Sequence, residues 1–512
     1  MRTFLLVIHL LLLAGLTGCA VNPVTGKNEL ALVPEATEIN IGKQQYLPSR
    51  QMQGGDYVVE PGVVEYVKGV GQRLARVSDR KLPYEFSVIN DSTPNAWALP
   101  GGKLAINRGL LVELDSEAEL AAVLGHEIVH AAARHGAKGM ERGMLLQGAI
   151  VAAGMASSNS EYSRLAIGGA GIAAQLIGQK YSRDAERESD YYGMQYMARA
   201  GYDPQAAIGL QQTFVRLSEG RDSSWLNGLF ASHPPSRERV EANRETAATL
   251  PSGGEIGRAR YQQAIAPLLR DREAYAAFDQ GRKALQAGNT ANALKLAQKA
   301  IDLQPREALF HSLRGDVRLQ QQNYRDAVIN YNRALQRHSQ YFHYYLQRGL
   351  ARLKLNQTAP AQQDLQQSVK LLPTAPALNA LGQLALDDGN RTGAKQYFAA
   401  AAGSPSEAGR QANRSLIRLD LPDNPHKYLQ LQLGRDNSNY LLARLRNTTA
   451  VSVTAVTLVL QFVDAQGRTR KAQLQLPGSL APGQTREMAT GIGPLAADAQ
   501  VGGQVIKARI EK

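Results

Sequence analysis

The sequence of 512 residues contains one cysteine, Cys19, so a disulfide within the chain is excluded whatever its compartment. It also lacks any apolar run as long as the roughly 20 residues that a membrane-spanning helix needs. A dense basic run is missing too, although the net charge is +13. Because Lys and Arg are scattered along predicted helices, we interpret them as a solvated surface that favours anionic lipid or cell-wall polymers, and we expect no nucleic-acid partner.

The N-terminus has the pattern of an export signal. Arg2 precedes an apolar run over 4–14, and Leu16-Thr17-Gly18-Cys19 follows. This pattern resembles the bacterial lipoprotein signal, in which the cysteine becomes the acylated first residue of the mature chain. The alternative is that Cys19 is an incidental small apolar residue. Ala20 stands where inner-membrane lipoproteins usually carry Asp, which favours the outer membrane and a periplasmic location.

The stretch after the cysteine is rich in turn residues and leads into a predicted helix near Pro34. We therefore predict a signal peptide over 1–18 and a membrane tether over 19–33. At no more than about 3.6 Å per residue, such a tether holds the next domain within about 50 Å of the bilayer.

The segment Gly125 to His130 writes H-E-x-x-H into a predicted buried helix. His126 and His130 are four residues apart, so both imidazoles lie on one helical face and can bind a single metal ion. Glu127 can reach a water at that metal without itself being a ligand. The apolar residues around the motif recur at helical spacing: Leu120, Val123, Leu124, Ile128 and Val129. A chance match of this short pattern is the alternative.

A third metal ligand is expected downstream. Glu186 and Asp190 share one face of a predicted helix, and Gly193 lets another backbone approach that face. Glu188 points away from it. On spacing alone, a solvated acidic helix start is at least as good an interpretation.

Four motifs in order resemble the zinc metallopeptidases related to HtpX, the CAAX prenyl proteases and the periplasmic protease BepA. These are H-E-x-x-H, the later E-x-x-x-D, the segment Asn95 to Leu104 and the segment Ser232 to Arg239. Trp97 stands where this family more often has Phe. The resemblance implies an α+β zincin-type metalloprotease domain over 34–265.

The resemblance also implies a zinc-dependent endopeptidase with one Zn²⁺ per chain. His126, His130 and Glu186 would be the ligands, and Glu127 the general base that deprotonates the attacking water. Asp190 would accept a hydrogen bond from the far ring nitrogen of a ligand histidine, with His126 the favoured donor, or act as a proton donor.

Asn95, Ala96 and Gly101 are predicted to belong to the substrate cleft. There an extended substrate would add as an edge strand beside the segment 103–107. Arg239 is assigned to the same binding region and is expected to hold a carboxylate of the Glu186 and Asp190 helix.

His233 has two alternative roles beside the metal. It could stabilise the oxyanion during catalysis, or it could occupy the open zinc position and silence the enzyme. His135, five residues after His130, should point off the ligand face, and we interpret it as structural.

Two apolar runs, 144–155 and 165–177, predict a helical hairpin between the two site helices. Each run is too short to cross a bilayer, so a buried or self-packed hairpin is favoured over contact with lipid.

Further along, Gly281, Gly315, Gly349 and Gly382 recur at intervals of 34, 34 and 33 residues. This period resembles the tetratricopeptide repeat, an all-α solenoid of helix pairs that binds peptides or proteins. We predict about four repeats over 272–406, with a purely structural role as the alternative. Short β-rich runs separated by turns predict a C-terminal all-β, sandwich-like domain over 424–512.

These features predict a multidomain, membrane-anchored periplasmic zinc metalloendopeptidase. It would degrade misfolded or stalled outer-membrane proteins in envelope quality control, and its repeats would bind substrates or the envelope assembly machinery. The main alternative is a chaperone or assembly scaffold with an autoinhibited peptidase site. A third hypothesis is a peptidoglycan-binding protein. It is based only on the basic net charge and the C-terminal β domain.

Overall fold

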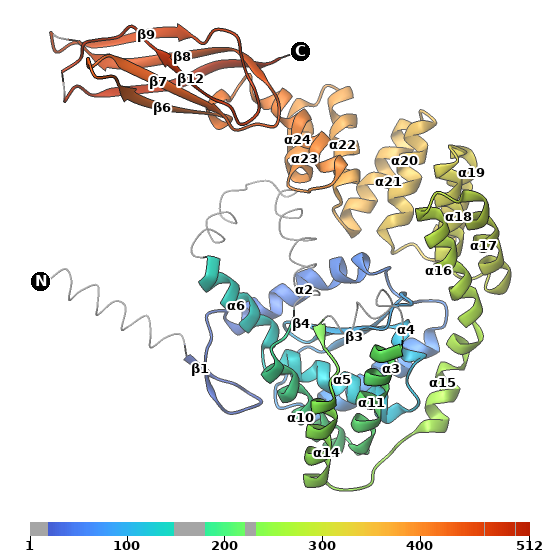
Figure 1. Ribbon diagram of the computed structural model, residues 1–512. Coiled ribbons are helices and arrows are strands. Elements are labelled where there is room, and N and C mark those ends of the chain that lie inside the picture. The colour runs from blue at the N-terminus through green and yellow to red at the C-terminus, as the bar shows by residue number, and fades with distance from the viewer. Residues whose placement is uncertain (1–18, 148–179, 221–231, 465, 497, 512) are drawn as a thin grey trace, which may run out of the picture. The chain divides into compact units, whose positions relative to one another are not determined.

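The computed structural model describes residues 19–147, 180–220, 232–464, 466–496 and 498–511 (Figure 1). The predicted signal peptide and most of the predicted apolar hairpin lie outside the described residues. The chain divides into two compact units, Met1–Pro373 and Thr374–Lys512, and each is described by itself. Within the described ranges, no helix is both long and apolar enough to cross a membrane.

The catalytic domain of the first unit contains a three-stranded sheet in the order β3-β5-β4. Its strands are β3 (Glu85–Ile89), β4 (Ala96–Leu99) and β5 (Lys103–Asn107). β3 runs parallel to β5, and β4 runs antiparallel to it. The expectation that a substrate adds beside 103–107 is wrong, because both edges of β5 are already paired. Among the described strands, β4 has the open edge on the side of the sheet away from β3.

Helices surround this sheet, so the predicted α+β class is confirmed. They are α2 (Glu35–Met52), α3 (Pro61–Arg76), α4 (Arg108–Leu111), α5 (Glu117–Ala132), α6 (His135–Gln147), α10 (Arg183–Arg199), α11 (Gln205–Gly220), α14 (Arg237–Thr249) and α15 (Arg258–Arg270). Helix α5 carries the H-E-x-x-H motif and is buried along almost its whole length. Its start is fixed by Ser116, whose hydroxyl accepts a hydrogen bond from the Glu119 backbone N–H.

Helices α5 and α10 cross at two glycines. A Cβ added to Gly193 would lie 3.1 Å from the His126 backbone nitrogen, and one added to Gly125 would lie 3.1 Å from the Gly193 carbonyl oxygen. The two backbones therefore approach more closely than ordinary side chains allow. This contact brings the motif helix against the helix of Glu186 and Asp190.

The segment after Cys19 forms a hairpin of β1 (Cys19–Val21) and β2 (Asn28–Leu30). The turn-rich sequence predicts the turn, but the strand pairing is not evident from so short a stretch. Val24, in the turn, is part of the hydrophobic core of the first unit. The predicted tether is thus largely folded onto the catalytic domain.

Six helices of the first unit form three antiparallel pairs: α16 (Arg272–Gln286), α17 (Thr290–Leu303), α18 (Ala308–Gln320), α19 (Tyr324–Arg337), α20 (Phe342–Lys354) and α21 (Thr358–Leu371). Five of them, all except α21, contribute residues to the hydrophobic core of the catalytic domain. A buried polar contact also joins them, because the Glu307 carboxylate accepts hydrogen bonds from Asn90 Nδ2 at 3.0 Å and from the Tyr275 hydroxyl at 2.6 Å.

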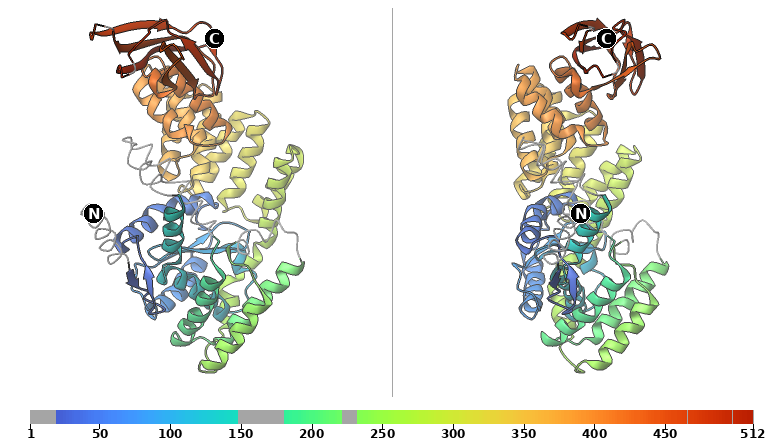
Figure 2. Two further views of the ribbon diagram at one scale, coloured as in Figure 1. Left: turned by 60° about the vertical axis from the view of Figure 1, so that its left-hand side comes forward. Right: turned by 90° about the vertical axis from the view of Figure 1, so that its left-hand side faces the viewer.

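The second unit contains α22 (Ala375–Asp387), α23 (Arg391–Ala402) and α24 (Glu407–Asp420), followed by β6 (Leu429–Arg435), β7 (Leu441–Asn447), β8 (Val453–Val463), β9 (Thr469–Gln475), β10 (Ser479–Leu480), β11 (Thr485–Ala489) and β12 (Val501–Ile510). One sheet has the order β11-β7-β6, and in the other β8 pairs with β9, β10 and β12. Figures 1 and 2 show this β domain at the C-terminal end of the chain. Leu445 and Leu458, one from each sheet, belong to one apolar core. The predicted β-sandwich is confirmed.

Candidate metal centre and active site

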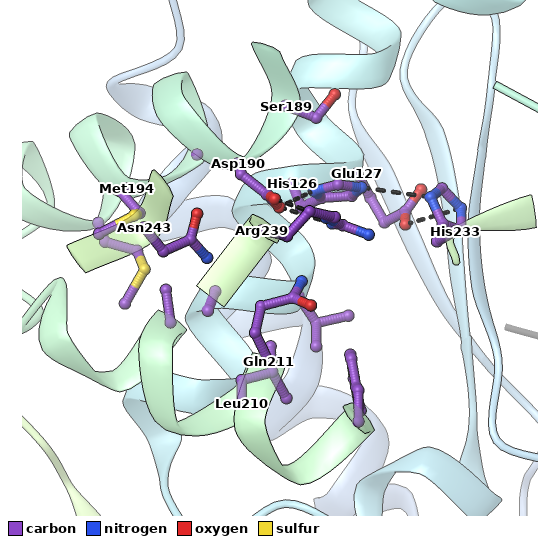
Figure 3. A pocket seen from close by; sticks show the side chains of 16 residues that line it. His126, Glu127, Ser189, Asp190, Met194, Leu210, Gln211, His233, Arg239 and Asn243 are labelled. Carbon is purple, nitrogen blue, oxygen red and sulfur yellow. Dashed lines mark hydrogen bonds and ion pairs between the residues drawn. The ribbon is translucent and has the colours of Figure 1, made fainter. Parts of the chain in front are cut away.

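Two helices and the segment before a third supply the side chains of the site, of which Figure 3 shows His126, Glu127 and His233. His126, Glu127 and His130 come from α5, and Glu186 from the first turn of α10. His233 comes from the segment just before α14. Serine caps fix two of these helices, since the Ser182 hydroxyl accepts from the Ala185 N–H and the Ser236 hydroxyl from the Arg239 N–H. Each site residue is therefore held at or near a fixed helix terminus or inside a buried helix.

Four donor atoms converge on one point. The Nε2 atoms of His126 and His130 lie 3.0 Å apart, and Glu186 oxygens lie 3.5 and 3.4 Å from these two nitrogens. His233 Nδ1 is 3.2 Å from His126 Nε2 and 2.9 Å from a Glu186 oxygen. All four donors lie within 4.8 Å of one another, and all four residues are buried.

This donor set fits a zinc ion. His126 uses Nδ1 and His130 uses Nδ1 in contacts on their outer sides, which leaves both Nε2 lone pairs facing each other. Two such lone pairs at 3.0 Å repel unless a cation lies between them. Burial alone would raise the pKa of Glu186, but His233 and the other histidines outweigh it and hold that pKa well below its usual range. Neutral imidazoles and a carboxylate are the ligands that zinc prefers.

Asp190 and Arg239 support one side of the centre. Asp190 Oδ1 lies 2.9 Å from His126 Nδ1. The Arg239 guanidinium donates two hydrogen bonds to Asp190, both at 2.7 Å, and lies 3.0 Å from Glu186. Burial alone would raise the pKa of Asp190, but the Arg239 charge outweighs it and lowers that pKa. Asp190 is thus a charged acceptor that orients the His126 ring, and Arg239 is occupied by two carboxylates.

His135 supports the other side of the centre, although the helical period places it off the ligand face. Its Nδ1 lies 2.9 Å from His130 Nδ1, and its Nε2 lies 3.2 Å from Glu188. The reason is local backbone geometry: α5 ends at Ala132, and Arg134 has a φ of 62°, which turns the chain back toward the helix. A helical wheel cannot anticipate that reversal, so sequence reasoning missed the contact.

Glu127 lies beside the four possible metal ligands but is not one of them. It is 2% exposed, and one of its oxygens has no hydrogen-bond partner among the described residues. Burial raises its pKa, against the opposing charges of His233 and His126. Its other oxygen is 3.6 Å from His233 Nε2. A buried carboxylate with a free lone pair and a raised pKa is suited to proton transfer.

Tyr181 is a site residue to which the sequence analysis assigned no role. Its ring stacks on His130, with the two ring centroids 3.9 Å apart, and lies 5.5 Å from the His233 ring. Aromatic residues are common before helices, so spacing alone gives no signal for this contact. The stacking covers one face of the metal centre.

A pocket extends from the centre toward α11 (Figure 3). Beyond His126 and Glu127 its lining is mixed, with the apolar Val123, Met194, Met197, Ala207, Leu210 and Phe214 and the polar Ser189, Asp190, Gln211, His233, Arg239 and Asn243. The Gln211 side-chain oxygen is buried and has no hydrogen-bond partner within the described ranges.

The predicted substrate-cleft residues occupy different positions. Ala96 begins β4 and is fully buried, and Asn95 precedes it, with a buried side-chain oxygen that lacks a partner among the described atoms. Gly101 has a φ of +75° in the turn between β4 and β5, and an added Cβ would lie 2.6 Å from the Ile39 Cα atom. Ala96 thus lies on the strand with the open edge and Asn95 directly before it, whereas Gly101 packs against α2.

Two imidazoles from one H-E-x-x-H helix, a carboxylate from a second helix and an adjacent free carboxylate define a metallopeptidase of the zincin class. Comparison with known families agrees. Residues 63–247 match Peptidase family M48, and residues 278–342 match the tetratricopeptide repeat. The prediction of tetratricopeptide repeats is therefore confirmed for residues 278–342.

Curated relatives show the same relationship. The chain is 34% identical over 190 residues to Metalloprotease YcaL of Escherichia coli (strain K12), covering 35% of this chain and 70% of that protein. It is 30% identical over 219 residues to the Beta-barrel assembly-enhancing protease of the same strain, covering 39% of this chain and 44% of that protein. It is 35% identical over 183 residues to Mitochondrial metalloendopeptidase OMA1 of Schizosaccharomyces pombe, covering 35% and 52%.

The chain belongs to peptidase family M48, whose zinc dependence agrees with the cluster of His126, His130, Glu186 and His233. The match spans less than half of the length of the assembly-enhancing proteases.

Proposed function

We propose that this protein is a zinc metalloendopeptidase of the bacterial envelope that cleaves misfolded or stalled outer-membrane proteins. The observation that carries the proposal is the convergence of His126, His130 and Glu186 on one point beside the free carboxylate of Glu127. The relatives named as beta-barrel assembly-enhancing proteases supply the substrate class.

In this account His126, His130 and Glu186 hold the metal. Asp190 and His135 accept hydrogen bonds from the outer ring nitrogens of the two histidines and so fix their tautomers. Zinc held there would lower the pKa of the attacking water to about 7 and would polarise the peptide carbonyl. Glu127 takes the proton from the attacking water and returns it to the leaving amine. Its raised pKa suits both transfers.

Substrate would bind in extended form along the open edge of β4, next to Asn95 and Ala96. Backbone hydrogen bonds would supply affinity, as in other strand-addition complexes. Segments that fail to pair within a β-barrel have free backbone groups of this kind, which makes them suitable substrates. The repeats would present such proteins, or the machinery that assembles them, to the cleft.

Cys19 is the proposed site of acylation, with the outer membrane as the compartment and the periplasm as the working space. Its position at the start of β1 and the lipoprotein-like sequence before it support this assignment.

His233 supports a second candidate function, a chaperone or scaffold with the peptidase held off. Its Nδ1 lies as near to the other donors as they lie to one another, in the position that a catalytic site keeps open for water. We propose that His233 is a fourth ligand in the resting state and leaves when substrate binds. Full autoinhibition is the limiting case of this arrangement.

The test is cleavage of an unfolded β-barrel protein by wild type, His233→Ala and His426→Ala, with a chelator-treated sample as the inactive baseline. His426 is exposed in the second unit and serves as the matched histidine control. We expect wild type and His426→Ala to cleave the substrate. We expect the cleavage rate of His233→Ala to be at least about tenfold higher than that of wild type. If all three proteins bind the substrate but cleave it no faster than the chelator-treated sample, the proposal of a scaffold replaces the proposal of an enzyme.

A further inference from the structure

The β1–β2 hairpin has one face that points away from the protein. Its antiparallel register pairs Cys19 with Leu30 and Val21 with Asn28. Residues paired across strands share a face, as do residues two apart along a strand. Val21, Asn28 and Leu30 therefore lie on the same face. Val21 is 61% and Leu30 46% exposed, and Leu32, further along the chain, is 44% exposed.

Two residues of the hairpin segment, Asn22 and Glu29, fix it to the catalytic domain. Asn22 is 2% exposed, and its side-chain amide donates to the Ala133 carbonyl at 3.2 Å. Glu29 forms an ion pair with Lys138 at 2.6 Å. With Val24 in the core, these contacts make the hairpin part of the domain surface.

Cations surround the exposed face. Lys27, Arg142 and Lys180 are exposed and line a hollow next to Leu30. Four carboxylates line the same hollow: Glu29 pairs with Lys138, Glu141 accepts from the Val33 backbone and pairs with Arg134, Glu188 pairs with His135, and Asp184 is exposed. Apolar side chains flanked by cations complement the surface of a membrane that contains anionic lipid.

We propose that the outward face of this hairpin, formed by Val21 and Leu30 and extended by the exposed Leu32, rests on the phospholipid bilayer. The catalytic domain then lies on the membrane in one orientation. It is not held at a variable distance by a flexible tether of up to about 50 Å. Cys19 is the first residue of β1, so an acyl chain attached there would enter the bilayer at this hairpin. This inference rests on the proposed acylation of Cys19.

The β1–β2 hairpin also contacts the segment that follows the metal-binding helix. Ala133, to which Asn22 is bonded, stands between His130 and His135, the two residues in contact at the centre. A hairpin that rests on the bilayer would thus place the active site at a fixed distance from the membrane surface, where barrel proteins that fail to insert are exposed.

The test uses the mature chain from Cys19 onward, coupled through its only thiol to a maleimide lipid in vesicles of phosphatidylethanolamine and phosphatidylglycerol. An encoded fluorescent amino acid replaces Leu30, and nitroxide-labelled lipid is the quencher. The matched control carries the same amino acid at Ile329, which is 47% exposed on α19.

We expect at least a twofold loss of fluorescence at position 30 and no change at position 329. Equal, weak quenching at both positions would overturn the proposal, because the chain would then be tethered without resting on the bilayer. Acylation is tested separately, by the mass of the Cys19 peptide from cell membranes. Failure of the bilayer contact and failure of the proposed anchor are therefore distinguishable.

Discussion

The Nδ1 atom of His130 lies 2.9 Å from Nδ1 of His135, and His135 in turn contacts Glu188. These two contacts fix the His130 tautomer that leaves Nε2 free for a metal. We predict that His135→Phe lowers zinc affinity by about 10-fold to 100-fold. Competition with a chromogenic chelator measures the affinity, and His426→Phe is the control. Unchanged affinity in His135→Phe would show that the contact has no role in metal binding.

Arg239 neutralises two buried carboxylates, Asp190 and Glu186, and is itself 7% exposed. Replacing it by Met leaves those charges without a cation, so Arg239→Met of the metal-free protein should lose about 3–5 kcal/mol of unfolding free energy. Denaturant unfolding measures this loss. Arg244, in the same helix, pairs with Glu241 at the surface, and Arg244→Met should cost less than about 1 kcal/mol. Equal losses in the two variants would contradict the assignment.

Gly193 allows the close crossing of α5 and α10. We predict that Gly193→Ala separates the helices and costs about 1–3 kcal/mol, because its Cβ would press on the His126 backbone. Gly209→Ala is the control, since its Cβ would have 3.7 Å to the nearest atom, and it should be neutral or slightly stabilising. Thermal unfolding and zinc content of both variants test this, and a Gly193→Ala protein as stable as wild type would rule it out.

Glu117 stabilises the start of α5. Its carboxylate accepts hydrogen bonds from Tyr66 at 2.5 Å, Tyr202 at 2.8 Å and Arg260 at 2.5 and 2.7 Å. Burial alone would raise its pKa, but these hydrogen bonds outweigh it and hold the pKa below its ordinary 4.5.

Because the folded-state pKa is the lower one, the contribution of Glu117 to stability is present above about pH 4.5 and is lost as the pH falls through the folded-state value. Glu117→Gln should therefore be about 2 kcal/mol less stable than wild type at pH 7, and the gap should close in acid. Denaturant unfolding across pH 3 to 7, with the exposed Glu65→Gln as control, measures the gap. A gap that is constant with pH would contradict the role of the charge.

Sequence reasoning succeeded where one regular period determines geometry. Spacing by four residues placed His126 with His130 and Glu186 with Asp190, and the 34-residue period marked the helix pairs. These predictions need only a helix, because its pitch is independent of the rest of the fold.

It failed where the backbone departs from a regular period or where pairing is set by distant segments. The left-handed Arg134 returns His135 to the centre, and no helical wheel contains that reversal. The central position of β5 depends on its pairing with both β3 and β4, which alternation within a single strand does not encode. Packing of the β1–β2 hairpin likewise depends on Ala133 and Lys138, more than a hundred residues away.

The most direct test of the proposed enzyme is Glu127→Gln, with zinc content and cleavage of an unfolded β-barrel protein measured on the same preparation. The account predicts about one zinc ion per chain, as in wild type, and a cleavage rate lower by about 10²-fold to 10⁴-fold. Cleavage at the wild-type rate by a zinc-loaded Glu127→Gln protein would contradict it.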